Sequence, residues 1–313
     1  MTRPTATTST IPHLPPPAKR AGVLLSVLAA LAASGCNDAP AKETVAEAAC
    51  QVVAKEVTLP DAADETSGLA ASRRHAGVYW THDDSGNQPV VFAVDASGQN
   101  LAAVQVTGAT NRDWEDAALG PCPGGDCLYL ADTGNNDGDD DVVALWRVPE
   151  PAPTDRESAP AERFTARFPQ GSPDTEALFV LPGGEVYLVT KGTRDPIELY
   201  RWPTPLAAGQ AATLQRVRRL APRPRQPGDR VTGASASPDG RWVAVRTYST
   251  LAFYRTPDLL GGGQPAAQVD LTPLGEPQGE AVELENDGAV TLTSEGGGHH
   301  LPGSLSRLAC KLP

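Results

Sequence analysis

The sequence predicts an all-β protein made of five similar sheets, and three observations lead to this prediction. A phrase with a polar or acidic start, an apolar run, a turn and a second apolar run recurs at a spacing of about 50 residues. Its copies start at Glu65, Glu115, Glu176, Thr232 and Glu280. Short apolar runs separated by Gly, Pro and Asp turns are typical of strands. Four such strands per copy, repeated around an axis, predict a five-bladed β-propeller.

Within one copy, four strands are expected in a fixed order. The first follows the leading residue, as in 177–181, and a turn such as Pro182-Gly183-Gly184 comes next. The second strand is apolar and aromatic, as in 186–189, and it ends in a polar cluster. A third strand follows, as in 197–201, and a weaker fourth strand precedes the next copy. This antiparallel order is that of a propeller blade.

The two ends of the repeat region are expected to share one blade. The copy that starts at Glu280 has only three strands before Pro313, whereas residues 52–59 form a good strand without a blade. We therefore predict that this N-terminal strand closes the ring in the last blade. Six blades would need one more repeat, for which only the interval from Glu115 to Glu176 has room. A β-sandwich would leave the repeat unexplained.

Residues 1–35 are interpreted as a secretory signal that is separate from the fold. Lys19 and Arg20 precede an uncharged apolar run, 21–34, which is shorter than the roughly 20 residues that span a bilayer. Small residues then stand directly before Cys36, and this end resembles the bacterial lipobox. The resemblance implies a lipid on Cys36 and an extracytoplasmic protein anchored in the bacterial cell envelope. An ordinary signal peptide is the alternative. Residues 36–49 are expected to be a tether and 50–313 a single domain.

The remaining four cysteines fit an exported protein with disulfides. Cys122 and Cys127 flank a turn, so a bridge across a hairpin tip is favoured. Cys50 and Cys310 bracket the repeats, and a bridge between them would close a very long loop. A zinc site is the competing use of four cysteines, but the spacing and the lack of a nearby His disfavour it.

The charge of the chain limits its partners. The formal net charge is −12. Residues 1–35 contain three basic residues and no acidic ones, so the rest of the chain has a net charge of −15. Such a surface repels phosphate backbones, so we expect no nucleic acid as partner. A small anionic molecule or a protein is expected instead, besides the membrane that the lipid would contact.

The residues 237–240, Ser-Pro-Asp-Gly, come before an apolar strand, and this motif is similar to the blade signature of TolB-type and WD40-like propellers. The phrases at 113–116, 174–177 and 278–281 resemble those of a group of exported propellers. That group is distantly similar to phytase-like, or esterase-like, propellers. The likeness covers about residues 50–310 and implies calcium in an acidic channel. Its motifs are specific for a propeller but give only weak support for phytase activity.

Acidic residues are expected to meet at one mouth of the central channel. The inner strand of each blade starts at this mouth and the second strand returns to it, so the leading residues and the polar clusters converge there. Carboxylates that are crowded together either take up protons or bind cations, and oxygen ligands suit a hard cation such as calcium. We therefore expect Ca²⁺ as cofactor, with the candidate metal ligands Glu65, Glu115, Glu176, Glu280 and Asp132.

The same mouth supplies the candidate ligand-binding residues. They are Asp83, Asp84, Trp114, Asp116, Asn135, Asp174, Lys191, Arg246, Tyr248 and Glu295. Two functions follow from this set. The protein binds a ligand or partner at its mouth, or it is a calcium-dependent phosphoester or ester hydrolase of phytase-like type in which Lys191 and Arg246 clamp the anion. We favour binding, because no general base with a clear partner is visible.

Purely structural interpretations stand beside these hypotheses. The glutamates could accept hydrogen bonds at strand ends or pair with Lys191 and Arg246. Trp114 could pack between blades. The acidic run 137–141 lacks the spacing of an EF-hand and is interpreted as a solvated loop. His299 and His300 follow three glycines and are expected in a mobile loop. Ser67 has no evident His and Asp partners, so a serine hydrolase is not supported.

Overall fold

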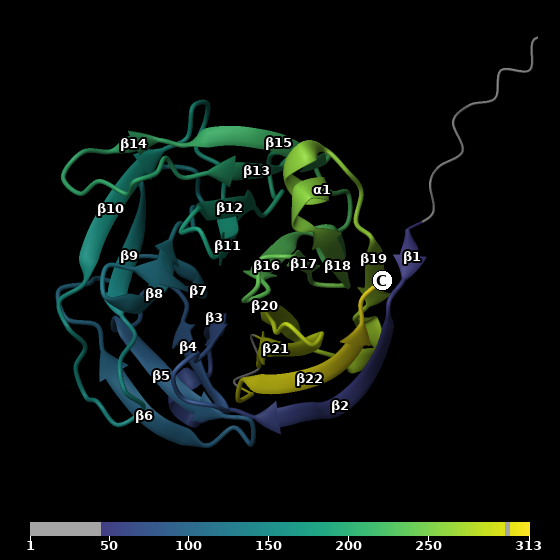
Figure 1. The fold of residues 1–313 in the computed structure, drawn as a ribbon, viewed down its shortest axis with the longest axis horizontal. Helices are drawn as coiled ribbons and strands as arrows, with labels where there is room; N and C mark the ends of the chain where they lie inside the picture. Colours follow the sequence, from purple (N-terminus) through teal and green to yellow (C-terminus); the bar gives the residue numbers. More distant parts are fainter. Residues whose placement is uncertain (1–44, 298–300) are drawn as a thin grey trace, which may run out of the picture. The chain divides into compact units, whose positions relative to one another are not determined.

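The computed structural model describes residues 45–297 and 301–313, which form a ring of five sheets (Figure 1). In blade 1, β3 (Thr66–Ala71), β4 (Val78–Asp83), β5 (Val90–Asp95) and β6 (Asn100–Gln105) follow in order. Blade 2 consists of β7 (Trp114–Cys122), β8 (Gly125–Asp132), β9 (Val143–Pro149) and β10 (Glu162–Arg167). In blade 3, β11 (Thr175–Val180), β12 (Val186–Thr190) and β13 (Ile197–Arg201) precede β15 (Gln215–Ala221).

The last two blades complete the ring. Blade 4 consists of β16 (Val231–Ala236), β17 (Trp242–Thr247), β18 (Thr250–Arg255) and β19 (Ala267–Asp270), with α1 (Thr256–Gly261) after β18. Blade 5 consists of β20 (Gln278–Leu284), β21 (Ala289–Glu295), β22 (Ser304–Lys311) and β2 (Ala49–Thr58). Two short strands, β1 (Ala46–Glu47) and β14 (Ala212–Thr213), pair in parallel with β19 and β10. Three 3₁₀ turns, η1 (Asp61–Ala63), η2 (Pro227–Asp229) and η3 (Thr272–Leu274), connect blades. The predicted five-bladed propeller is confirmed.

The inner strands β3, β7, β11, β16 and β20 lie nearest the centre of the ring (Figure 1). Each of them lies beside the inner strand of the next blade, and β20 lies beside β3. These strands start at the recurring phrase of the sequence, so the repeat corresponds to the blade. The end of the ring where the inner strands start is called the mouth below.

The chain termini close the ring as the sequence predicts. Strand β2 pairs antiparallel with β22 as the outer strand of blade 5, and Cys50 lies opposite Cys310. A disulfide joins these two cysteines, and a second one joins Cys122 to Cys127 at the hairpin between β7 and β8. The pairing of β1 with β19 adds a second contact between the N-terminal segment and the last blades. Residues 46–47, within the expected tether, therefore belong to the sheet structure.

The core consists of five clusters, one between each pair of neighbouring blades. Between blades 2 and 3, for example, Phe164 packs with Leu188 and Tyr200. Burying one such side chain stabilises the fold by about 1.5–3 kcal/mol. Because every blade packs against two others, the inner strands are held in fixed positions around the axis. This rigidity is what can hold side chains of different blades close together.

The expected leader lies outside the described residues. Cys36, the candidate lipidation site, falls there too, as do His299 and His300. Among the residues that the structure describes, no helix is long and apolar enough to cross a bilayer. The two disulfides are consistent with an extracytoplasmic location.

Candidate metal centre

Each inner strand carries a β-bulge near its start, at the mouth. A bulge leaves an extra residue unpaired and re-aims its side chain. The bulged residues are Ser67, Glu115, Glu176, Thr232 and Glu280. The hydroxyls of Ser67 and Thr232 donate to the carbonyls of Glu115 and Glu280 in the next blade, at 2.7 Å and 2.8 Å. Because both residues make the same kind of hydrogen bond to the next blade, Ser67 and Thr232 occupy equivalent positions.

The prediction for Glu65 is therefore wrong in register. Ser67, not Glu65, is equivalent to the three bulge glutamates. Glu65 lies two residues before the bulge, is exposed, and accepts a hydrogen bond from Asn87 Nδ2 at 2.7 Å. Its equivalents are Asp113 and Asp174, which likewise accept backbone N–H groups from the end of the second strand through their carbonyl oxygens. Glu115, Glu176 and Glu280 occupy the expected positions.

Five carboxylates of blades 1 to 3 form one cluster at the mouth. Ligand oxygens of Asp84, Asp113 and Glu115 lie within 4.8 Å of one another, and so do those of Glu115, Asp174 and Glu176. We call these sets the first and the second triad. Glu115 belongs to both. The carboxylates reach this place from the end of β4 and from the starts of β7 and β11.

Glu115 lies at the centre of this cluster and has no local partner. Its side chain is 4% exposed, and within 45–297 and 301–313 no group donates a hydrogen bond to its carboxylate. Burial, with Glu176, Asp84 and Asp113 nearby, raises the pKa of Glu115 well above its ordinary value. A buried carboxylate without a donor is costly unless a proton or a cation compensates for it. Glu115 is thus the strongest single indication of a cation site.

Gly134 makes room for these carboxylates. A Cβ atom at this position would lie 2.0 Å from Glu115 Oε1 and 2.3 Å from Asp113 Oδ2. Only glycine avoids such contacts, so the loop after β8 can pass directly over the first triad. One oxygen of Asp113 is also buried without a partner, and burial raises the pKa of Asp113 to about 6. The first triad is therefore crowded and electrostatically uncompensated.

The second triad contains a cation of the chain itself. Lys191 Nζ lies 2.6 Å from Glu176 Oε1 and 3.9 Å from Asp174 Oδ2. Burial nevertheless raises the pKa of Glu176 to about 7, which Lys191 opposes. Asp174 accepts a hydrogen bond from the backbone N–H of Asn135 at 3.0 Å. The amide of Asn135 binds the carbonyls of Asp140 and Ser172, so this residue orders the loop around the cluster.

The blade 5 side of the mouth also contains buried carboxylates, one of which has an amide partner. Gln278 Nε2 donates to Glu295 Oε2 at 2.9 Å, and burial raises the pKa of Glu295 to about 8. Glu280 is 4% exposed and its pKa is raised well above normal by burial, Glu176 and Glu295. Burial and Glu280 raise the pKa of Tyr248, which Lys191 opposes. Within the described residues, Glu280 belongs to neither triad.

Several predicted site residues have structural roles instead. Asp132 accepts hydrogen bonds from Asp113 N at 3.0 Å and from Trp146 Nε1 at 3.2 Å, so both oxygens are used inside blade 2. Trp114 is fully buried in the core between blades 1 and 2 and lines no ligand surface. Arg246 is also fully buried, where it pairs with Glu276 and donates to the carbonyls of Ala281 and Thr293.

Asp116 lies inside the channel rather than at its mouth. One oxygen accepts from Ala117 N at 2.8 Å, and the other accepts from Leu178 N at 2.8 Å and Ala234 N at 3.2 Å. Its carboxylate thus joins inner strands of three blades. Burial raises its pKa although these three donors oppose the shift. Asp83 is nearly buried, with one oxygen unpartnered, and burial raises its pKa to about 7.

Sequence reasoning missed Asp113 and Gly134 as parts of the site. The signal for Asp113 was present, because an acidic residue stands two positions before the bulge glutamate in both blade 2 and blade 3. Three aspartates of the acidic run line a groove of about 320 Å³ together with Arg112 and Asp113; they are Asp137, Asp139 and Asp140. Arg112 pairs with Asp140 there. The described residues contain no carboxylate triad within this run.

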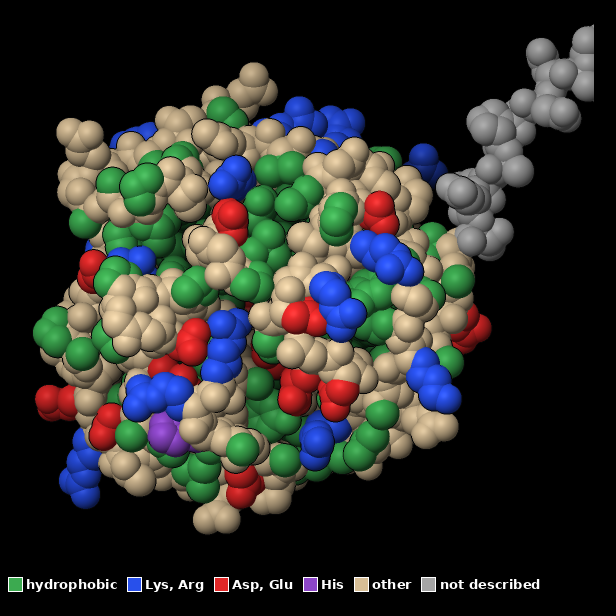
Figure 2. Space-filling view, in the orientation of Figure 1, with side chains coloured by type: hydrophobic (Ala, Val, Ile, Leu, Met, Phe, Trp, Pro, Cys, Tyr) green, Lys and Arg blue, Asp and Glu red, His purple; other side chains and the backbone are tan. Residues whose placement is uncertain are grey.

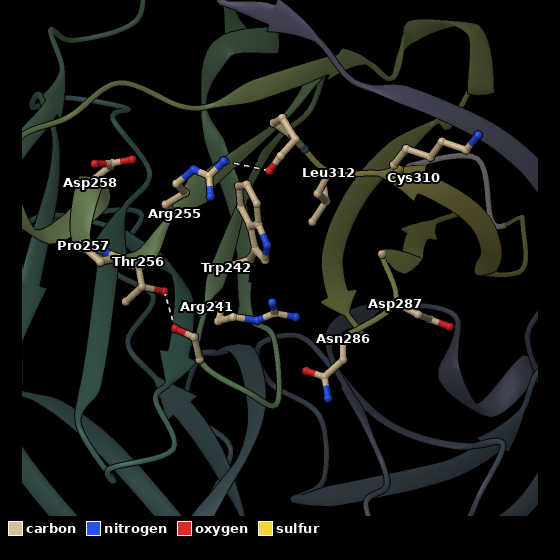
Figure 3. A pocket seen from close by; sticks show the side chains of 14 residues that line it. Arg241, Trp242, Arg255, Thr256, Pro257, Asp258, Asn286, Asp287, Cys310 and Leu312 are labelled. Atoms are coloured by element: carbon tan, nitrogen blue, oxygen red, sulfur yellow. Dashed lines mark hydrogen bonds between the residues drawn. The ribbon is translucent and has the colours of Figure 1, made fainter.

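One cavity lies at the opposite end of the ring from the carboxylates. It has a volume of about 790 Å³ and lies between blades 4 and 5 (Figure 3). Arg255 covers the Trp242 ring at 4.9 Å and donates to the Pro313 carbonyl at 2.8 Å. Strand β18 leads from the mouth to α1, so this cavity is on the α1 face. Basic and acidic side chains are interspersed on that face (Figure 2), which does not favour one ligand charge.

Comparisons with known proteins identify the fold alone. No family model matches this sequence, and no curated protein matches it. Among solved structures, a PQQ-bound aldose sugar dehydrogenase from Streptomyces coelicolor is similar with a TM-score of 0.52 and 12% identity, over 85% of this chain and 99% of that chain. A gluconolactonase from Xanthomonas campestris has a TM-score of 0.46 and 14% identity, over 79% and 72% of the two chains.

A virginiamycin B lyase from Staphylococcus aureus is also similar, with a TM-score of 0.39 and 10% identity over 79% of this chain and 68% of that chain. At these identities the likeness is one of architecture. Proteins that share the propeller fold have different functions, so the function must be argued from the mouth itself.

Proposed function

We propose that this protein is an extracytoplasmic, lipid-anchored propeller that binds Ca²⁺ at its acidic mouth and uses that face to bind a ligand or partner. The observation that carries this proposal is Glu115, a buried carboxylate without a hydrogen-bond donor that is shared by two carboxylate triads. The lipid on Cys36 remains a prediction from the leader. The disulfides agree with the oxidising environment that the proposal requires.

The donor set favours calcium over other metals. Both triads consist of carboxylates, and hard oxygen donors suit Ca²⁺ or Mg²⁺ rather than zinc or copper. The oxygens come from three blades and from loops, which gives an irregular arrangement. Calcium accepts irregular coordination with six to eight oxygens, whereas Mg²⁺ requires a nearly ideal octahedron. Carbonyl oxygens, waters or an anionic ligand would complete the shell around Asp84, Asp113 and Glu115.

The hydrolase alternative has less support. It needs Lys191 and Arg246 as an anion clamp. Arg246 is buried and paired with Glu276, and Lys191 is paired with Glu176. His82 is buried, and burial lowers its pKa to about 4, so it is neutral but enclosed beside Trp114. A screen of phosphoesters and esters with and without EDTA would restore this alternative if metal-dependent turnover were found.

Calorimetric titration with CaCl₂ and with MgCl₂ tests the proposal. We expect the wild type to bind Ca²⁺ more tightly than Mg²⁺, and the Glu115→Gln variant to lose this binding. Glu283→Gln is the matched control, because Glu283 is a glutamate at the other end of the channel whose carboxylate already accepts from Ser235 Oγ at 3.0 Å. Calcium binding that survives Glu115→Gln, or a wild type without calcium binding, would refute the proposal.

A further inference from the structure

The two triads differ in whether a basic side chain lies beside their carboxylates. In the second triad, Lys191 Nζ lies at 2.6 Å from Glu176 and 3.9 Å from Asp174. In the first triad, no Lys or Arg nitrogen of the described residues lies within 4.0 Å of Asp84 or Asp113. The nearest candidate, Arg112, is engaged by Asp140, by Asp132 at 3.6 Å and by the carbonyl of Gly134 at 3.2 Å. One triad therefore has an internal cation and the other has none.

Lys191 occupies a position that recurs in every blade, so its charge can be compared with that of the equivalent residues. Lys191 stands at the end of the second strand of blade 3, and the residues at the corresponding strand ends of the other blades are Asp84, Thr133, Tyr248 and Glu295. Blade 1 thus places a carboxylate where blade 3 places an ammonium group. The Lys191 side chain is 13% exposed, and its ammonium group lies between the carboxylates of Glu176 and Asp174. A buried ammonium among carboxylates compensates them much as a bound cation does.

We infer that the mouth contains two cation positions that share Glu115, and that Lys191 permanently supplies the cation of the second one. The wild type then binds a single Ca²⁺, at Asp84, Asp113 and Glu115. This inference rests on the proposed function and deepens it by assigning the stoichiometry and the ligands. It also draws on Glu115, which is 4% exposed and whose carboxylate belongs to both triads, and on Asp113 Oδ1, which is buried without a partner.

Electrostatics explain why both positions cannot take a calcium ion while Lys191 is present. Like charges a few ångströms apart repel each other strongly inside a protein, and the double charge of a calcium ion doubles this repulsion. Lys191 also occupies the space between Glu176 and Asp174. Removal of its charge leaves those two carboxylates and Glu115 without compensation, which recreates at the second triad the condition that now exists at the first.

The Lys191→Met variant tests this inference, because methionine has nearly the shape of lysine without its charge. Calorimetry and native mass spectrometry should give one Ca²⁺ for the wild type and two for Lys191→Met. Lys191→Arg, which keeps the charge, should bind one, and the double variant Lys191→Met with Glu176→Gln should return to one. In EDTA, Lys191→Met should have a lower Tm than the wild type, and Ca²⁺ should raise its Tm by more than it raises that of the wild type.

A second pair of variants keeps the test decisive if Lys191→Met does not fold. Glu176→Gln should still bind one Ca²⁺ with a Kd changed by about tenfold or less, whereas Asp113→Asn should weaken binding by about 100-fold or more. The opposite order would place the ion in the second triad and overturn the inference.

The failures of the two proposals are distinguishable. One Ca²⁺ in both the wild type and Lys191→Met overturns the inference and leaves the calcium function standing. No Ca²⁺ in the wild type but one in Lys191→Met overturns the calcium function and supports Lys191 as the resident cation. No Ca²⁺ in either protein overturns both.

Discussion

Removal of the Cys50–Cys310 disulfide should destabilise this protein far more than removal of the Cys122–Cys127 disulfide. The two bridges span 260 and 5 residues of sequence. A cross-link stabilises the fold mainly because it restricts the unfolded chain, and this effect grows with the logarithm of the loop length. The loop-entropy relation gives about 5.5 kcal/mol for the long loop and about 2 kcal/mol for the short one.

The difference between the two bridges is more informative than either value. The constant part of the relation cancels, and about 3.5 kcal/mol remains from the ratio of the loop lengths. The environments also match, because each bridge joins a buried cysteine, Cys310 or Cys127, to a partly buried one. Replacing each pair by serine therefore introduces similar desolvation penalties, which largely cancel in the comparison.

The assay is guanidinium unfolding of the wild type and of the two double-serine variants, followed by tryptophan fluorescence under nonreducing conditions. The free energy of unfolding should fall by about 3.5 kcal/mol more in Cys50→Ser/Cys310→Ser than in Cys122→Ser/Cys127→Ser. Hydrogen exchange should show increased opening of β2 and β22 only in the first variant. Equal losses in the two variants would refute the argument that the terminal bridge closes the ring.

Three further predictions concern the mouth. Burial raises the pKa of Asp113 to about 6 and that of Glu176 to about 7, so Ca²⁺ must displace protons when it binds. The calcium affinity measured by calorimetric titration should therefore increase from pH 5 to pH 8. An affinity that does not change with pH would contradict this prediction. Because the folded state holds these protons up to a higher pH than the unfolded state does, the stability of the calcium-free protein should fall as pH rises from 4.5 to about 7, as urea unfolding in EDTA would show. Gly134→Ala should weaken calcium binding, because its Cβ would lie 2.0 Å from Glu115 Oε1, whereas Gly261→Ala, with no atom within 4 Å, should leave the Kd unchanged.

The architecture was predictable because it depends on patterns that recur along the chain. Apolar runs and glycine turns locate the inner strands, and an unpaired N-terminal strand with terminal cysteines indicates how the ring closes. The register in blade 1 was not predictable in this way. Glu65 matches the other glutamates by residue type, but the bulge lies at Ser67 and Gly68. Comparison of 67–69 with 232–234, Ser-Gly-Leu with Thr-Gly-Ala, would have given the correct alignment.

The ion-pair partners at the mouth were not predictable for a different reason. Arg246 was expected to face a ligand, but Glu276 lies 30 residues further along and reaches it only in the folded ring. Asp132 was expected to bind a metal, but Trp146 of the neighbouring strand uses one of its oxygens. Such pairings depend on side-chain directions across strands and blades. The sequence pattern predicts at which end of the ring a polar residue lies. It does not predict which side chain of another strand or blade will pair with that residue.

The structure breaks the repeat at the mouth in a way that concentrates charge on one side. Blades 2 and 3 carry both an aspartate and a bulge glutamate, and blade 1 adds Asp84. In blades 1 and 4 the bulge residue is Ser67 or Thr232, whose hydroxyl donates to a carbonyl of the next blade. In blade 5, Gln278 stands in the place of the aspartate and donates to Glu295. Hydroxyls and an amide thus replace some of the carboxylates in blades 1, 4 and 5, whereas the two carboxylate triads both include Glu115, where a cation can bind.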